Sequence, residues 1–244
     1  MKDVVFRTAE NSALTKNVYR MVLEGDTSDI KRPGQFVNVK LSGFYLRRPI
    51  SVCDCEDGRL TLIYKVAGRG TEQMTKLVAG DGLSVLCGLG NGYDQSVCGD
   101  APLLIGGGVG VPPLYMLAKR LRLEGKSVSV LLGFNTADEV FYENEFKSLG
   151  CSVTVTTVDG TYGKPGFVTD NLPDEYTYFY TCGPLPMLKA VYKCCKSDGQ
   201  FSFEERMGCG FGACMGCSCR TVTGYKRICK EGPVLYKEEI LWEK

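Results

Sequence analysis

Four cysteines packed into eleven residues constrain this chain more than any other feature of its sequence. They lie in CGFGACMGCSC at 209–219, and a fifth, Cys229, follows in YKRICKEGPVL. Cys209, Cys214 and Cys217 have the spacing C-x4-C-x2-C, which with one later cysteine is the plant-type pattern for a [2Fe–2S] cluster. A tight loop supplies three thiolates and a later strand the fourth, so that all four converge on two irons. We predict that these three residues and Cys229 are the metal ligands.

Small and basic residues around the cysteines suit such a cluster. Glycines let the backbone wrap closely and aim amides at the sulfurs, and basic side chains near Cys229 can offset the negative charge of the cluster. These residues are Gly208, Gly210, Gly212, Gly216, Lys226, Arg227 and Lys230. Cys219 lies two residues beyond Cys217 and is expected to be a spare thiol, because the other four already complete the pattern.

A structural zinc site is the alternative for the same cysteines. Zinc usually takes two paired C-x2-C knuckles or mixes in histidine, whereas this chain has one knuckle, an x4 gap and no histidine. The absence of histidine also excludes a Rieske-type cluster, which needs two, and ordinary histidine-based acid–base or triad catalysis. We therefore expect cofactors to carry the chemistry.

Bulk properties narrow the class of protein further. The 244 residues carry a formal net charge of +1, which provides no broad field for nucleic acid or a membrane surface. No apolar run approaches the roughly 20 residues that span a bilayer, and MKDVVFRTAENSALT lacks the apolar region of a signal peptide. We expect a cytoplasmic protein whose thirteen cysteines stay reduced, those outside the cluster being mostly small buried hydrophobes.

Secondary-structure patterns divide the chain into three parts. Residues 1–98 hold short β-rich runs such as GQFVNVKL, with one helical run, TEQMTKLV, and predict a small antiparallel β-barrel. In residues 99–199 strands alternate with helical runs such as PPLYMLAKRLRLEG and DEVFYENEFKSLG, which predicts a doubly wound parallel sheet of the nucleotide-binding α/β class. Residues 200–244 show neither pattern, so we expect the cluster rather than a core to organise this small module.

A glycine-rich turn follows the first strand of the α/β part. In LLIGGGVGVPPLYML, Gly108, Gly110 and Pro113 form G-x-G-x-x-P at a strand end just before a helix. Small residues let a pyrophosphate approach the backbone, and the helix N-terminus offers free amides. The standard dinucleotide fingerprint requires an acidic residue at the end of the next strand, and this chain has none there. However, Asp138 and Glu139 follow it without an arginine suited to a 2′-phosphate, which favours NAD over NADP.

Three more motifs complete an ordered series. RRPIS lies on a barrel strand at 47–51, IYKVAGRGT follows at 63–71, and TCGP ends a later strand at 181–184. Singly, each motif also fits an edge strand or a plain turn. In this order, with the glycine turn between them, they resemble the ferredoxin–NADP reductase superfamily. The resemblance implies that the Arg-to-Ser motif holds flavin, the glycine turn holds the nicotinamide dinucleotide, and the pair Cys182–Gly183 lies by the nicotinamide.

A closer resemblance runs along essentially the whole chain. MGCGFGACMGCSC and YKRICKEGPVL, together with LRRPISV and GLGNGY, are similar to the electron-transfer subunits of type B, NAD-dependent dihydroorotate dehydrogenases. One departure is visible: these subunits usually have GPLGN where this chain has CGLGN, so that Cys87 and Gly88 replace glycine and proline.

The closer resemblance also implies a set of flavin residues. Arg48 and the pair Gly70–Thr71 would meet the phosphates of FAD, and Ser51 would lie near the reactive edge of the ring. Ser51 and Cys182 are thus the expected residues at the reacting centre. The implied FAD-binding residues are Arg48, Pro49, Ile50, Ser51, Ile63, Tyr64, Lys65, Gly70 and Thr71.

The implied function is conversion between one-electron and two-electron carriers. The resemblance implies that dihydroorotate is oxidised at FMN in a separate catalytic subunit, and that electrons pass through the cluster and FAD of this chain to NAD in pyrimidine biosynthesis. It implies a heterotetramer of two copies of each subunit. Barrel, nucleotide domain and cluster module use up the chain, so a partner must hold dihydroorotate, and the isolated chain should not oxidise it.

Three alternatives stay open at this point. One is the flavin and iron–sulfur subunit of an NADH-dependent ferredoxin:NADP oxidoreductase or a sulfide dehydrogenase. Resemblance to that group implies an aspartate in place of the first cluster cysteine, so Cys209 speaks against it. The second is a non-enzymatic, zinc-binding interaction module on a degenerate reductase fold. The third is an iron-dependent redox sensor, which would hold the cluster but show no turnover of NADH.

Overall fold

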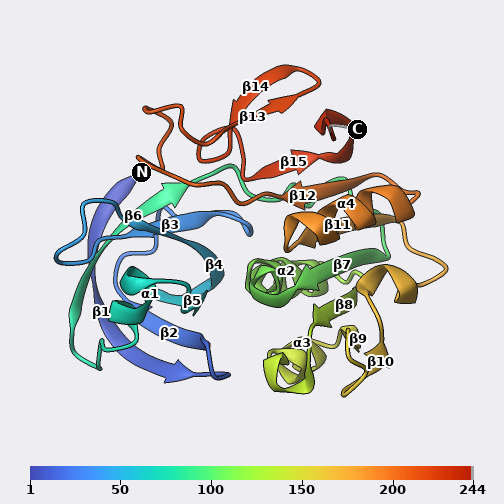
Figure 1. Ribbon diagram of the computed structural model, residues 1–244, viewed down its shortest axis with the longest axis horizontal. Helices are drawn as coiled ribbons and strands as arrows, with labels where there is room; N and C mark the ends of the chain where they lie inside the picture. Colours follow the sequence, from blue (N-terminus) through green and yellow to red (C-terminus); the bar gives the residue numbers. More distant parts are fainter. Residues whose placement is uncertain (243–244) are drawn as a thin grey trace.

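The structure is a computed structural model that describes residues 1–242 as a barrel, a large sheet flanked by helices, and a small cysteine-rich ribbon above both (Figure 1). The strands are β1 (Lys2–Ala13), β2 (Val18–Glu24), β3 (Phe36–Val39), β4 (Arg48–Glu56), β5 (Arg59–Lys65), β6 (Gly82–Leu89), β7 (Pro102–Gly107), β8 (Ser129–Phe134), β9 (Ser152–Thr157), β10 (Lys164–Pro165), β11 (Tyr178–Cys182), β12 (Gly199–Ser202), β13 (Ser218–Thr221), β14 (Gly224–Arg227) and β15 (Val234–Tyr236). The α-helices are α1 (Arg69–Met74), α2 (Tyr115–Leu123), α3 (Glu143–Ser148) and α4 (Leu185–Cys194). Short 3₁₀ turns cover Gly108–Gly110, Pro112–Leu114, Ala137–Glu139, Val168–Asn171 and Lys237–Glu239.

The first half forms the predicted closed antiparallel barrel. Its strand order is β1-β2-β5-β4-β3-β6. Buried positions alternate with more exposed ones along β6, because successive side chains of a strand point to opposite faces. The inward side chains, among them Phe6, Met21, Leu62 and Val85, form one hydrophobic cluster. The long strand β1, which the sequence pattern did not single out, closes the barrel by pairing with both β2 and β6.

The second half is a seven-stranded sheet in the order β10-β9-β8-β7-β11-β12-β15. All pairs are parallel except β12 with β15. Leu117 of α2 and Phe146 of α3 pack on one face, whereas Leu188 of α4 packs on the other with Leu103 and Phe179. Helices cover both faces, as the doubly wound prediction requires.

Two predicted helices are shorter than their sequence runs. DEVFYENEFKSLG forms only a 3₁₀ turn and the six-residue α3, because Tyr142 between them has a φ of 67°, in the left-handed region that interrupts a helix. The helix expected at TEQMTKLV begins earlier, at Arg69, and ends at Met74.

The C-terminal part is ordered partly by the sheet, which corrects the expectation that the cluster alone organises it. β12 pairs with β11, β15 pairs with β12, and between them residues 203–233, here called the cluster segment, carry the β13–β14 hairpin and the cysteine loop (Figure 1). Cys217, Ile228 and Cys229 belong to the same hydrophobic cluster as Phe201 of β12. The division at residues 98/99 and 199/200 stays a prediction, and the sheet extends across the second boundary, because both β12 and β15 belong to it.

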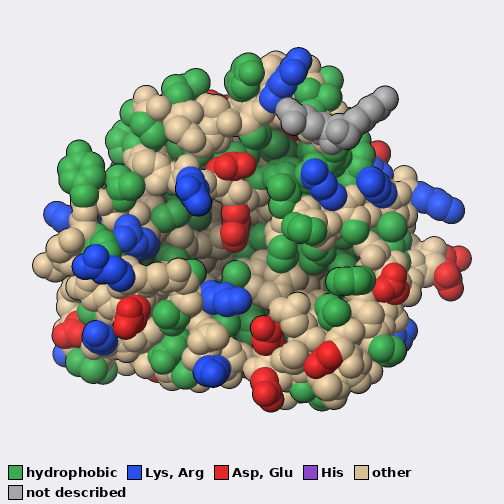
Figure 2. Space-filling model, in the orientation of Figure 1, with side chains coloured by type: hydrophobic (Ala, Val, Ile, Leu, Met, Phe, Trp, Pro, Cys, Tyr) green, Lys and Arg blue, Asp and Glu red, His purple; other side chains and the backbone are tan. Residues whose placement is uncertain are grey.

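Two further features bear on the sequence expectations. Gly88, which stands where proline is usual, has a φ of 75°, which proline cannot adopt because its ring holds φ near −65°. On the face shown in Figure 2, Lys and Arg side chains are interspersed with Asp and Glu. Within residues 1–242 no helix is both long enough and apolar enough to cross a membrane.

Candidate flavin, nicotinamide and cluster sites

Two cavities meet where the barrel faces the carboxyl ends of the parallel strands. The larger has a volume of about 650 Å³ and the smaller about 310 Å³. Lys65, Val109 and Glu204 line both. Ligands of open α/β sheets bind at this edge of the sheet, so two ligands could contact each other here.

The smaller cavity gathers most of the predicted flavin residues. Its wall includes six of the nine: Pro49, Ile50, Ser51, Ile63, Tyr64 and Lys65. They come from the neighbouring strands β4 and β5. The hydroxyl of Tyr64 donates a 3.0 Å hydrogen bond to the side chain of Asn11 on β1, so towards a ligand this oxygen could only accept.

Arg48 and α1 form a cationic corner beside this cavity. A side-chain carbon on Gly70, in the first turn of α1, would overlap the guanidinium of Arg48, so glycine is required for this approach. The guanidinium also packs over Phe44, at 4.5 Å from the ring centroid. Thr71 completes the turn by accepting the N–H groups of Ala67 and Gly68 at 2.9 and 3.2 Å.

The two arginines of RRPIS have different environments. Arg47 pairs with Asp3 at 2.6 Å and donates to the carbonyl of Asn38 at 3.3 Å. Arg48 has no carboxylate partner within the described residues and donates to the carbonyl of Leu46 at 2.6 Å. An unpaired guanidinium beside glycine backbone fits a phosphate of FAD. The environment of Arg48 thus supports the flavin role that its motif implies.

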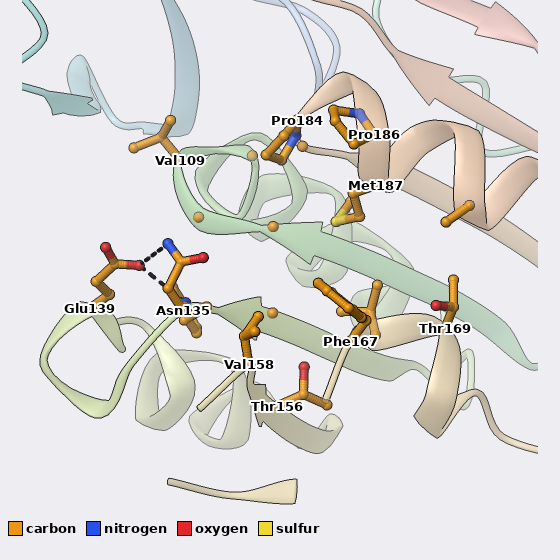
Figure 3. A pocket seen from close by; sticks show the side chains of 18 of the residues that line it. Val109, Asn135, Glu139, Thr156, Val158, Phe167, Thr169, Pro184, Pro186 and Met187 are labelled. Carbon is orange, nitrogen blue, oxygen red and sulfur yellow. Dashed lines mark hydrogen bonds between the residues drawn. The ribbon is translucent and has the colours of Figure 1, made fainter. Parts of the chain in front are cut away.

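The glycine turn forms one wall of the larger cavity (Figure 3). Gly108 and Gly110 line it, and a side-chain carbon on Gly110 would overlap the carbonyl of Cys182. Glycine therefore lets the turn lie directly against the TCGP strand end. Pro113 is buried behind the turn and does not line the cavity.

Cys182 lies behind this wall. Its side chain is 2% exposed, and burial raises its pKa to about 12, so the thiol is neutral at physiological pH. Gly183, not Cys182, lines the cavity. The predicted place of Cys182 beside the nicotinamide stays a prediction.

The larger cavity is also lined by an acidic and an aromatic residue, Glu139 and Phe167 (Figure 3). Glu139 accepts hydrogen bonds from the backbone N–H and the side-chain amide of Asn135 at 3.1 and 2.8 Å. Of the two acidic candidates, Glu139 lines the cavity and Asp138 does not. Phe167, 62% exposed, presents an open ring to the same space.

Glu204 is a site residue that sequence reasoning missed. It follows β12 and lines both cavities. Its side chain is exposed to this open space, but the surrounding walls displace enough water to raise the pKa of its carboxyl above the ordinary value. The only local signal is an acidic pair, Glu204–Glu205, one residue after a buried strand. The cavities that it joins also include residues far away in the sequence, such as Lys65 and Val109.

The four predicted cluster cysteines come together as two pairs. The thiols of Cys209 and Cys214 are adjacent, as are those of Cys217 and Cys229. Cys217 directly precedes β13, and Cys229 lies in the turn after β14 rather than on a strand. In residues 1–242 no three Cys, Asp or Glu side chains surround a single point as ligands of one metal ion. Two adjacent pairs fit the two irons of a [2Fe–2S] cluster.

Backbone amides surround these sulfurs as a cluster requires. Cys209 Sγ accepts the N–H groups of Ala213 and Cys214 at 3.2 and 3.4 Å, and Cys217 Sγ accepts that of Cys229 at 3.4 Å. Burial pushes the pKa of Cys209 up, but these donors bring it down to about 6. Burial and the neighbouring sulfur of Cys217 raise the pKa of Cys229 to about 12. Crowded thiols of this kind ionise together only around a cationic centre.

The chain is similar to families of known proteins that have these sites. The family model for the iron-sulfur cluster binding domain of dihydroorotate dehydrogenase B matches residues 204–241, and that of an oxidoreductase NAD-binding domain matches residues 104–193. The dihydroorotate dehydrogenase B (NAD(+)) electron transfer subunit of Fusobacterium nucleatum is 41% identical over 248 residues, covering 95% of each chain. That of Bacillus pumilus is 42% identical over 255 residues, covering 98% of each. The chain belongs to this family.

Solved structures agree with this membership. An NADH-dependent reduced ferredoxin-NADP oxidoreductase, described for its flavin-based electron bifurcation, matches with a TM-score of 0.88 and 28% identity, over 97% of this chain and 90% of that chain. A ferredoxin NADP+ reductase from Neisseria gonorrhoeae with bound FAD and NADP matches with a TM-score of 0.69 and 16% identity, over 80% of this chain and 90% of that one, which shows the fold alone. Among the functions left open by the sequence, the family identifies the electron-transfer subunit.

Proposed function

We propose that this chain carries electrons from the FMN of a dihydroorotate-oxidising partner subunit, through a [2Fe–2S] cluster and FAD, to NAD. The observation that supports this most is the junction of the two cavities, which share Lys65, Val109 and Glu204. When bound, the flavin exchanges hydride with a nicotinamide and single electrons with the cluster. A shared wall lets the two ligands contact each other directly, as hydride transfer requires.

Residues of the barrel would hold and orient FAD. Arg48 would neutralise a phosphate beside Gly70, where the guanidinium has no competing carboxylate. Ser51 lines the smaller cavity, so its hydroxyl would face the reactive edge of the ring. Tyr64 and Ile63 close the wall from β5 and exclude water from the flavin.

Residues of the sheet would hold NAD. The turn at Gly108–Gly110 would accept the pyrophosphate at a strand end. Glu139, held by Asn135, would accept the ribose hydroxyls and repel a 2′-phosphate. Phe167 would stack on the adenine ring. Cys182 would support the nicotinamide from behind Gly110 as a neutral thiol, because burial raises its pKa to about 12.

The cluster segment would face the partner. Phe211 and Met215, within the cysteine loop, are 45% and 54% exposed, so apolar surface borders the ligand thiols. We propose a catalytic subunit containing FMN as this partner, in a heterotetramer of two copies of each subunit. All thirteen cysteines are free, which suits the reducing cytoplasm.

Activity with and without the partner tests this proposal. The purified chain is expected to contain FAD and one [2Fe–2S] cluster and to reduce artificial acceptors with NADH. Addition of the co-purified catalytic subunit is expected to produce dihydroorotate-dependent reduction of NAD. Dihydroorotate oxidation by the partner-free chain, or a chain that binds neither cofactor after reconstitution, would contradict the proposal.

A further inference from the structure

Asn38 is a buried polar residue on the wall of the barrel that the cluster segment covers. Its strand neighbours Val37 and Val39 point into the barrel core, so Asn38 points outward with Phe36, which packs in the same hydrophobic cluster as Cys217. Asn38 is 2% exposed, and its Oδ1 has no hydrogen-bond partner. Packing alone would favour an apolar side chain here, because an unpaired buried polar atom costs free energy.

The side-chain amide of Asn38 reaches the first cluster ligand. Its Nδ2 donates to the carbonyl of Cys209 at 3.4 Å. The approach is so close that a side-chain carbon on Gly210 would overlap Nδ2. Gly210 also has a φ of 77°, which glycine adopts without strain.

The cysteine loop is thus held at two carbonyls by different parts of the molecule. Arg227, from β14 of the cluster segment itself, donates to the carbonyl of Gly212 at 2.6 Å. Asn38 holds the carbonyl of Cys209 from the barrel. Directly after the Gly212 anchor, Ala213 and Cys214 direct their N–H groups at Cys209 Sγ. Hydrogen bonds to ligand sulfurs raise the reduction potential of an iron–sulfur cluster.

The strand that carries Asn38 is also part of the flavin wall. Asn38 lies opposite Pro49 in the β3–β4 register, and Pro49 lines the smaller cavity. The backbone of Asn38 is fixed in turn, because Arg47 donates to its carbonyl at 3.3 Å while pairing with Asp3. One short stretch of β3 therefore contacts the first cluster ligand and pairs with the predicted flavin motif.

We propose that Asn38 is a positioning residue for the iron–sulfur cluster: from the flavin barrel it fixes the Cys209 turn, maintains the N–H···S bonds of that turn, and so raises the reduction potential of the cluster. The inference rests on the proposed function, because it requires Cys209 to ligate a cluster. It adds a cluster-tuning role for a barrel residue outside the cysteine segment.

Two substitutions in the holoprotein test the inference. Asn38→Leu keeps a similar size but removes the amide donor. Asn38→Asp keeps the shape but replaces the donor with a carboxylate oxygen. Thr8→Val is the matched control, because Thr8 is also a barrel residue, is 1% exposed and has an unpartnered Oγ1, while its backbone bonds to the turn at Gly80 and Asp81 within the barrel.

The cluster potential, the electron paramagnetic resonance spectrum of the reduced cluster, and the rate of iron loss to a chelator are the readouts. For Asn38→Leu we expect a more negative potential, altered g-values and faster iron loss, with the FAD-to-protein ratio unchanged. Asn38→Asp should shift the potential further, because a nearby negative charge disfavours reduction. Thr8→Val should match the wild type. If Asn38→Leu does not fold, Asn38→Ser, whose hydroxyl is too short to reach Cys209, should show the same negative shift.

A wild-type potential and spectrum in Asn38→Leu would overturn the inference, as would a loss of FAD in proportion to iron, which would make Asn38 a barrel packing residue. Failure of the proposed function is a separate result. It would appear as a wild-type protein that binds no cluster or no FAD.

Discussion

The barrel and the cluster segment are held together by different means. The barrel closes its hydrogen-bond ladder on itself around one hydrophobic core. The cluster segment has two four-residue strands, and its loop turns through positive φ angles at Gly210, Gly212 and Met215. The four predicted ligand thiols occupy the centre of the cysteine loop, in place of a set of large apolar side chains. The barrel should therefore keep its shape without cofactor, whereas metal binding in the cluster segment contributes directly to its folding free energy.

The sheet limits how far this difference extends. β12 and β15 bind the two ends of the cluster segment into the sheet, and Ile228 packs in the core of that sheet. Loss of the metal should thus loosen the cysteine loop without unfolding the sheet or the barrel. The predictions below test this contrast, starting with the largest expected effect.

The largest effect is expected from the ligand thiols. Serine at Cys209, Cys214, Cys217 or Cys229 should abolish the visible iron–sulfur absorbance, since each thiolate would hold iron directly. Amide hydrogen exchange should rise in residues 203–233 and stay low in the barrel, and FAD should be retained. Cys219→Ser is the control, with wild-type iron content. A cluster that survives Cys229→Ser but not Cys219→Ser would show that the ligand assignment is wrong.

An intermediate effect is expected from Arg48, which tests the barrel alone. A charge-assisted bond to phosphate is worth about 1.5–3 kcal/mol, so Arg48→Ala should weaken FAD binding roughly 10- to 150-fold. Iron content should stay at one cluster per chain. Flavin titration and the flavin-to-protein ratio after gel filtration measure this. Arg47→Lys is the control, because Arg47 pairs with Asp3 and this variant should keep the wild-type FAD affinity. If Arg48→Ala binds FAD as tightly as Arg47→Lys, Arg48 does not contact the flavin.

The smallest effect is expected at Glu204, where barrel, sheet and cluster segment meet. The side chain is exposed to the open cavity, but partial desolvation by the cavity walls raises its pKa above 4.5, so the folded protein favours the neutral carboxyl. Ionisation then costs stability, a cost that is absent below pH 4.5, grows as the pH rises from 4.5 to the raised pKa, and is constant above it. Glu204→Gln should therefore melt at a higher temperature than the wild type near pH 7, and the gap should narrow toward pH 5. Glu205→Gln controls for the loss of one charge, and a gap independent of pH would contradict the burial argument.

Much of the architecture could be predicted from the sequence because it depends on local patterns of apolar, polar and turn-forming residues. Short β-rich runs followed by alternating strands and helices are enough to predict a barrel joined to a doubly wound sheet. Helix lengths were harder, since Tyr142 in a left-handed conformation ends a run that has helical composition. The first strand, β1, was missed because its inward residues, such as Val4 and Phe6, are followed by a polar stretch.

The sequence by itself determined the ligand spacing of Cys209, Cys214 and Cys217 and the order of the flavin and nicotinamide motifs, because a loop that wraps metal or phosphate needs particular residues at short, fixed intervals. Only the tertiary structure decided that Glu204 joins two cavities, that Glu139 rather than Asp138 lines one of them, and that Asn38 contacts Cys209. Asn38 and Cys209 are separated by 171 positions, and no local pattern records a contact that forms only when the barrel, the sheet and the cluster segment pack together. Packing also changes the environment of the residues that it brings together. Desolvation raises the pKa of the Glu204 carboxyl, and burial leaves Asn38 Oδ1 without a hydrogen-bond partner, and the sequence neighbours of these two residues predict neither property.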